Sequence, residues 1–146
     1  MRTMGLDVGS RTVGIAISDA LGITAQGLTT LRRTGLKADL AELQRLAIEH
    51  EVTRVVVGLP LNMDGSEGPA AETARAFGEA AARVTGLPVE YQDERLTTAA
   101  AERVLLEADV SRQKRRKVID RLAAQLILQT WLDARRPAQE EEPEVL

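Results

Sequence analysis

The chain has 146 residues, no cysteine and a formal net charge of −3. This length suits one domain with a substantial core, and a chain without cysteine forms neither disulfides nor thiolate metal sites. No apolar run is long enough to span a bilayer and the start has no signal-peptide pattern, so we expect a soluble cytoplasmic protein. With one Trp, one Tyr and one Phe, an aromatic platform for stacking nucleic-acid bases is not expected.

The first predicted elements are two strands of a β-hairpin. Two β-rich runs, one around Asp7 and one at 13–18, flank a short turn that contains Gly9, which is the pattern of a hairpin. Asp7 is thereby placed inside a hydrophobic strand, where a carboxylate is costly unless it is neutralised, paired or bound to a metal. The alternative is that Asp7 only caps the turn beside Gly9.

The rest of the chain alternates between helices and strands. The continuous β-branched run at 54–58 is typical of a central parallel strand that is buried on both faces, and Pro69 suits the first position of a helix. Further strands are expected at 27–31 and 89–92, and helices at 36–50, 69–84, 99–108 and 114–134, after a connector at 109–113. This order predicts an α/β fold in which a mixed five-stranded sheet is flanked by helices.

Charge is unevenly distributed at the end of the chain. Residues 136–146 hold one Arg and four Glu, so the rest of the chain is formally neutral. We expect residues 1–136 to form one domain and residues 137–146 to be an acidic, disordered tail. A basic cluster precedes this tail, interrupted only by Asp120, and consists of Arg112, Lys114, Arg115, Arg116, Lys117 and Arg121. It is either a solvated helix face or a surface that binds nucleic-acid phosphates.

Carboxylates from three parts of the chain are candidates for one site. Asp7 lies near the end of the first strand, and Asp93 and Glu94 follow the last one, so they can meet at the edge of the sheet where sites of open α/β sheets form. Strand alternation puts Asp93 and Glu94 on opposite faces, so only one of them can point toward Asp7. The third candidate is Asp120, an acid with small or apolar helical neighbours, although an ion pair with an adjacent base also explains it. The core stripe predicted for its helix consists of Val118, Ile119, Leu122, Ala123, Leu126 and Ile127.

Three carboxylates without histidine or cysteine suit hard cations, Mg²⁺ or Mn²⁺. Two such ions about 3.5–4 Å apart commonly promote attack of water on a phosphodiester. Arg95 is placed to orient a phosphate or the carboxylates. The loop that begins at Asn62 lacks the Gly-Lys-Ser/Thr ending of a nucleotide-binding P-loop, and we expect it to contact nucleic acid instead.

Four motifs in this order resemble the YqgF family, whose members are described as pre-16S rRNA nucleases and as Holliday-junction-resolvase-like proteins. They are the hairpin at 5–19, the segment 57–65, the segment 93–98, and residues 117–120 with the apolar helix after them. The resemblance covers almost the whole chain except the acidic tail. It implies a ribonuclease-H-like fold, divalent-metal-dependent phosphodiester hydrolysis and maturation of the 5′ end of small-subunit rRNA. It also implies that Asp7, Glu94 and Asp120 are the catalytic metal ligands.

Other functions remain open at this point. A DNA nuclease that resolves junctions uses the same chemistry, and because symmetric cleavage needs two active sites it implies a homodimer. A noncatalytic ribosome-assembly factor would only bind rRNA. An actin-like or sugar-kinase-like ATPase also begins with such a hairpin, but it closes two lobes around its nucleotide, and this chain has the length of one lobe.

Overall fold

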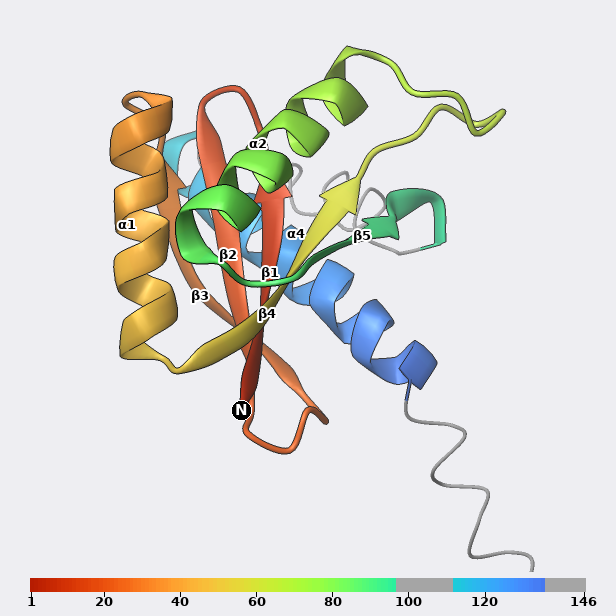
Figure 1. The fold of residues 1–146 in the computed structure, drawn as a ribbon. Coiled ribbons are helices and arrows are strands. Elements are labelled where there is room, and N and C mark those ends of the chain that lie inside the picture. Colours follow the sequence, from red (N-terminus) through yellow and green to blue (C-terminus); the bar gives the residue numbers. More distant parts are fainter. Residues whose placement is uncertain (97–111, 136–146) are drawn as a thin grey trace, which may run out of the picture.

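The computed structural model describes residues 1–96 and 112–135, with side chains for 1–95 and 121–135. Five strands form one sheet in the order β3-β2-β1-β4-β5, and helices cover both of its faces (Figure 1). The strands are β1 (Arg2–Val8), β2 (Thr12–Ser18), β3 (Ala25–Arg32), β4 (Val52–Leu59) and β5 (Val89–Asp93). The helices are α1 (Leu36–Glu49), α2 (Pro69–Thr85) and α4 (Arg112–Arg135), and a single 3₁₀ turn, Glu94–Leu96, follows β5.

The sheet is mixed, as the order of the elements predicted. β1 pairs antiparallel with β2 and parallel with β4, and β4 pairs parallel with β5. The carboxyl ends of β1, β3, β4 and β5 therefore lie at the same edge, which we call the site edge and which is uppermost in Figure 1. The predicted helix at 99–108 and the tail at 137–146 lie outside the described residues.

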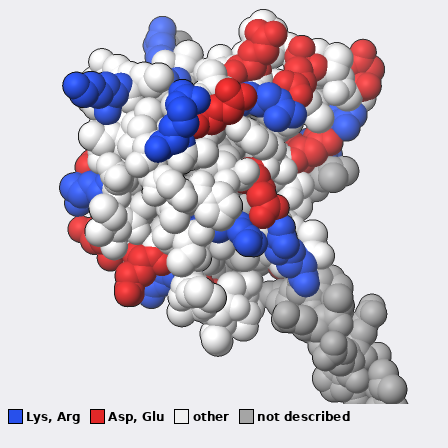
Figure 2. Space-filling model, in the orientation of Figure 1, with Lys and Arg blue, Asp and Glu red and all other residues white. Residues whose placement is uncertain are grey.

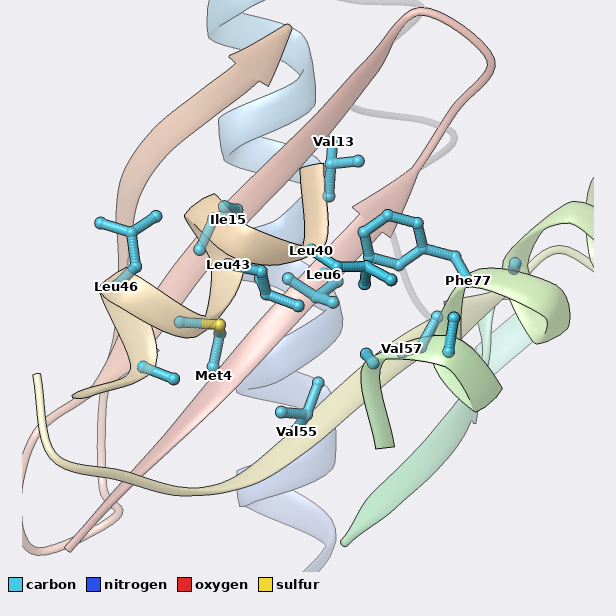
Figure 3. Packing of buried hydrophobic residues seen from close by; sticks show 14 of the residues in the cluster. Met4, Leu6, Val13, Ile15, Leu40, Leu43, Leu46, Val55, Val57 and Phe77 are labelled. Carbon is cyan, nitrogen blue, oxygen red and sulfur yellow. The ribbon is translucent and has the colours of Figure 1, made fainter. Parts of the chain in front are cut away.

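One face of the sheet packs against α1 and α2. Alternate residues of the strands point to this face, among them Met4, Leu6 and Val57, and Figure 3 shows them meeting Leu43 of α1 and Phe77 of α2. β4 supplies side chains to both faces, since Val55, Val56 and Val57 are each 0% exposed. The prediction of a doubly buried central strand is therefore confirmed, because a side-chain period of two forces alternate valines into two different layers.

The other face is lined by small residues and packs against α4. A methyl group placed on Gly5 would lie 2.7 Å from Cβ of Leu128. α4 therefore crosses the sheet so closely that only a glycine fits at position 5. Gln125 and Gln129 fix this crossing, because their side-chain oxygens accept hydrogen bonds of 3.2 and 2.8 Å from the amides of Gly27 and Ala25. α4 thus runs from β3 toward β5, where Arg135 contacts Glu90.

The structure corrects two details of the prediction for the last helix. Arg112 and Gln113, expected in a connector, belong to α4. Its buried stripe is also shifted by about one position, since Leu122 and Leu126 are only partly buried. Among residues 121–135 of α4, the buried ones are Ala123, Ala124, Ile127, Leu128, Trp131 and Leu132. Close approach to glycines favours small side chains at the contact, which a pattern based on the largest apolar residues overlooks. None of the described helices is both long and apolar enough to cross a membrane.

Candidate active site

Asp7 lies on the α4 side of the sheet near the end of β1. It follows Gly5 by two residues and therefore shares its face, and it is only 9% exposed. On one side it pairs with Gly14 of β2. On the other side its neighbour is Gly58, one residue beyond the Leu6–Val57 pair of β1 and β4. The predicted buried carboxylate is therefore present, with a glycine on each adjacent strand.

Glu94 brings a second carboxylate to the same face. A methyl group placed on Gly58 would lie 3.1 Å from Oε2 and 3.3 Å from Cδ of Glu94, so this carboxylate lies directly over the glycine. Because adjacent strands are about 4.8 Å apart, it is one strand away from Asp7. The side chain that β4 lacks at Gly58 leaves the space in which the two carboxylates come together.

Asp93 points to the opposite face of the sheet. It pairs with Leu59, which belongs to the core beneath α1 and α2. Its carboxylate accepts a hydrogen bond of 2.7 Å from Nη2 of Arg95 and one of 2.8 Å from the Arg95 amide. The side-chain hydrogen bonds from Arg95 lower the pKa of Asp93. Of the two acids left open by the sequence, Glu94 is thus the one on the Asp7 face, and Asp93 holds Arg95.

Arg95 in turn holds the loop that begins at Asn62. Its Nη1 donates a hydrogen bond of 3.2 Å to the carbonyl of Met63. Inside the loop, the Asn62 side-chain amide donates to Oγ of Ser66 at 3.0 Å, and that hydroxyl donates to Asp64 at 2.6 Å. Asn62, expected to contact nucleic acid, is therefore engaged in shaping the loop, and Asp93 with Arg95 anchors the loop at the site edge.

Arg95→Ala is expected to raise the pKa of Asp93, because the hydrogen bonds from Arg95 are the main cause of its lowering. A carboxyl whose folded pKa is below its unfolded value, about 3.9, contributes stability above that pH and loses it as the pH falls through the folded pKa. Unfolding of the variant should therefore depend less on pH below about 4. A carboxyl-carbon NMR titration measures the shift. Arg75→Ala, which breaks the separate 2.7 Å pair with Glu67, should leave Asp93 unchanged; an equal shift in both variants would contradict the assignment.

The third predicted carboxylate lies on α4. Asp120 is three and four residues before Ala123 and Ala124, so the helical repeat places position 120 at the start of the buried stripe. The carbonyl of Ala124 is 3.2 Å from the position of a methyl group on Gly5, two residues before Asp7. The basic residues Arg112, Lys114, Arg115, Arg116 and Lys117 occupy the first turns of the same helix. The side chains of all six residues lie outside the described set.

The candidate metal ligands at this edge, Asp7, Glu94 and Asp120, all offer oxygen atoms. The single histidine, His50, ends α1 at the opposite edge, where Nε2 lies 3.2 Å from Glu49. Among the side chains of residues 1–95 and 121–135, no group of three or more His, Cys, Asp and Glu is arranged to hold a metal ion. Since the side chain of Asp120 is not in that set, the described part of the site consists of the two carboxylates of Asp7 and Glu94.

Two features of the site edge were missed by sequence reasoning. The first is Gly58, which makes room for Glu94; a glycine that ends a run of valines was its only signal. The second is Asp39, which is 1% exposed and pairs with Nε of Arg33 at 3.2 Å. Asp39 lies four residues before Leu43 in the apolar stripe of α1, and an acid on such a stripe indicates a buried partner.

The Arg33–Asp39 pair fixes the hairpin turn that follows Asp7. Nη1 of Arg33 donates a hydrogen bond of 3.0 Å to the carbonyl of Gly9, and its amide donates one of 2.8 Å to the carbonyl of Arg11. Asp39 also accepts a hydrogen bond of 3.0 Å from the amide of Thr34. The guanidinium lies 5.2 Å from the ring centre of Phe77. Arg33 thus joins the turn to both helices of that face.

Comparison with known proteins gives the fold and the family. The chain is similar to RuvC of T. thermophilus in complex with Holliday junction substrate, with a TM-score of 0.56 and 16% identity over 92% of this chain and 96% of that one. It is also similar to the Fowlpox virus resolvase in a complex with Holliday junction DNA, with a TM-score of 0.53 and 10% identity over 92% and 98% of the two chains. The expected ribonuclease-H-like fold is confirmed.

The sequence matches are much closer. A protein of Myxococcus xanthus named "Putative pre-16S rRNA nuclease" is 67% identical over 94% of this chain and 91% of its own length. A protein of the same name from Symbiobacterium thermophilum is 61% identical over 92% and 94% of the two lengths. The family model described as RuvX, Holliday junction resolvase, matches residues 1–134. The resemblance inferred from four motifs is thereby confirmed, and the chain belongs to the RuvX family of nucleases, also called YqgF.

Proposed function

We propose that this protein hydrolyses a phosphodiester bond of the 16S rRNA precursor and so matures its 5′ end in the cytoplasm. The observation that carries the proposal is that Asp7 of β1 and the carboxylate of Glu94, which lies over Gly58 of the adjacent strand β4, share the face that α4 crosses. The names of the relatives from Myxococcus xanthus and Symbiobacterium thermophilum support the rRNA substrate. Residues 1–136 are the nuclease domain in this proposal.

A divalent cation fits the residues at the site. Carboxylates without nitrogen or sulfur donors prefer Mg²⁺ or Mn²⁺, and Asp7, Glu94 and Asp120 would hold the metal. When bound, such an ion activates water and neutralises the charge that develops on the phosphate. Asp7 and Glu94 would fix the place of that ion at the site edge, and the basic first turns of α4 hold the flanking backbone of the nucleic acid by phosphate contacts.

The test is cleavage of two labelled substrates side by side, a 5′-extended rRNA precursor and a four-way DNA junction. Each is incubated with Mg²⁺, Mn²⁺ or EDTA. We expect cleavage of the RNA that requires the metal and that EDTA abolishes. Cleavage that persists in EDTA would contradict the metal requirement.

A DNA junction nuclease is the second candidate, favoured by the description of the family model that matches residues 1–134. Paired nicks in the junction, with the RNA intact, would establish it and would imply a homodimer with two active sites. Binding of the RNA precursor without cleavage of either substrate would instead establish a noncatalytic assembly factor.

A further inference from the structure

Three exposed basic side chains gather at one corner of the site edge without acidic partners. Arg11 lies in the turn between β1 and β2, Arg32 ends β3, and Lys37 lies in the first turn of α1. We call these three residues the corner cluster. Figure 2 shows basic side chains at the upper left, over the start of α1, with acidic side chains further to the right. The arginines that pair with carboxylates are different ones: Arg33, Arg45, Arg54, Arg75, Arg95 and Arg135.

The acid that follows Lys37 by two residues, Asp39, is buried and paired with Arg33. Between Val8 and Ala38 the only acidic residue is Asp19, which lies at the far end of the hairpin and accepts hydrogen bonds from the amides of Ile23 and Thr24. No ion pair to the corner cluster is present among the described residues. Like charges that are held together without compensation repel one another, and they attract a polyanion.

The backbone that carries the cluster is fixed. Arg32 pairs with Thr12 across β2 and β3, and the hydrogen bond from the Arg33 amide to the Arg11 carbonyl joins the hairpin turn to the end of β3. The guanidinium of Arg33 is neutralised by Asp39, so it belongs to this scaffold and not to the cluster. The fold therefore fixes the backbones of Arg11 and Arg32 beside each other, and Lys37 follows Arg32 by five residues at the start of α1.

Arg32 of the corner cluster lies on the same face of the sheet as Asp7. Gly14, which pairs with Asp7, and Thr12, which pairs with Arg32, lie on the same face of β2 because they are two residues apart. Arg32 therefore stands on the face of Asp7, two strands away and two residues further along the strand, at about 12 Å.

We propose that the corner cluster binds phosphates of the nucleic-acid strand that flank the bond held at Asp7. This inference rests on the proposed function, which puts the reacting phosphate at Asp7 and Glu94. It adds phosphate contacts on the opposite side of Asp7 from the asparagine loop, at the end of β3, the strand from which α4 starts across the sheet. Each phosphate contact releases counterions and makes binding more dependent on salt.

The experiment measures equilibrium binding of the labelled RNA precursor in EDTA, so that cleavage does not enter, from about 50 to about 200 mM KCl. We expect each of Arg11→Ala, Arg32→Ala and Lys37→Ala to weaken binding. The triple variant should flatten the slope of log K against log salt by about 2, since each contact contributes about 0.7–0.9. Arg83→Ala is the matched control, because Arg83 is exposed and likewise has no ion pair, but lies at the opposite edge in the last turn of α2.

A wild-type slope in the triple variant overturns the proposal, and so does an equal loss in Arg83→Ala, which would show an effect of net charge alone. Thermal unfolding of the variants checks that the fold is intact. If the wild-type protein binds and the triple variant flattens the slope, but no substrate is cleaved, the corner cluster stands and the proposed catalysis fails. If cleavage is metal-dependent and the slope is unchanged, the reverse holds.

Discussion

Asp7→Asn is expected to abolish cleavage while nucleic-acid binding and the fold are retained. The substitution keeps the shape of a side chain that is 9% exposed and removes only its charge, which the proposed metal site requires. Loss of groups that merely support metal ligands already costs about 10–100-fold in activity, so we expect a loss of at least about 100-fold. Initial rates on the RNA precursor, measured over a range of Mg²⁺ concentrations, give the effect.

Glu94→Gln and Asp93→Asn test whether the loss expected for Asp7→Asn is specific to acids on the same face of the sheet. The two acids are adjacent, but only Glu94 lies over Gly58 on the Asp7 face, whereas Asp93 is bound to Arg95 on the other face. Glu94→Gln should therefore reduce cleavage as strongly as Asp7→Asn, and Asp93→Asn should reduce it less. Full activity of Glu94→Gln, or a greater loss in Asp93→Asn, would show that the wrong acid has been assigned to the site.

Asp39→Asn is expected to lower the free energy of unfolding by about 3 kcal/mol. Removing one partner of a buried ion pair leaves the other charge uncompensated, at a cost of about 3–5 kcal/mol. We expect the lower end of this range because the side chain of Arg33 remains 19% exposed and can be partly hydrated, whereas that of Asp39 is 1% exposed. Urea unfolding, with the change in midpoint at constant slope, measures the loss.

Glu90→Gln is the control for that variant. Glu90 pairs with both Arg54 and Arg135, but its side chain is 38% exposed, and exposed pairs contribute about 1 kcal/mol or less. An effect of Asp39→Asn no larger than that of Glu90→Gln would contradict the structural importance of the Arg33–Asp39 pair. Faster amide exchange at Gly9 in Asp39→Asn would further show that the pair fixes the hairpin turn.

Much of the architecture follows from local patterns in the sequence. The hairpin around Gly9, the doubly buried strand that contains Val56 and the helix that begins at Pro69 all appear where expected. Each depends on short-range physics, namely turn chemistry, side-chain alternation or a fixed φ. The four motifs were also enough to identify the family.

The convergence of the site could not be derived from the sequence alone. Strand alternation shows that Asp93 and Glu94 diverge, but not which of them faces Asp7; that depends on the pairing of Leu59 with Asp93 and on which face α4 covers. The register of a parallel pair is set by packing between segments far apart in the chain. The buried stripe of α4 was misplaced for a related reason, since its contacts were selected by glycines on three different strands.

The sequence by itself thus determined the order of the elements, the family and a short set of candidate acids, because these depend on residue types and their spacing. Only the tertiary structure decided that Glu94 lies over Gly58 beside Asp7, that Asp93 and Arg95 anchor a loop, and that Arg33 and Asp39 hold the hairpin turn. It also separated the paired arginines from the corner cluster. A charged residue finds its partner only when the chain folds. Ion pairs between strands and helices depend on the distances between these elements, which no local pattern encodes.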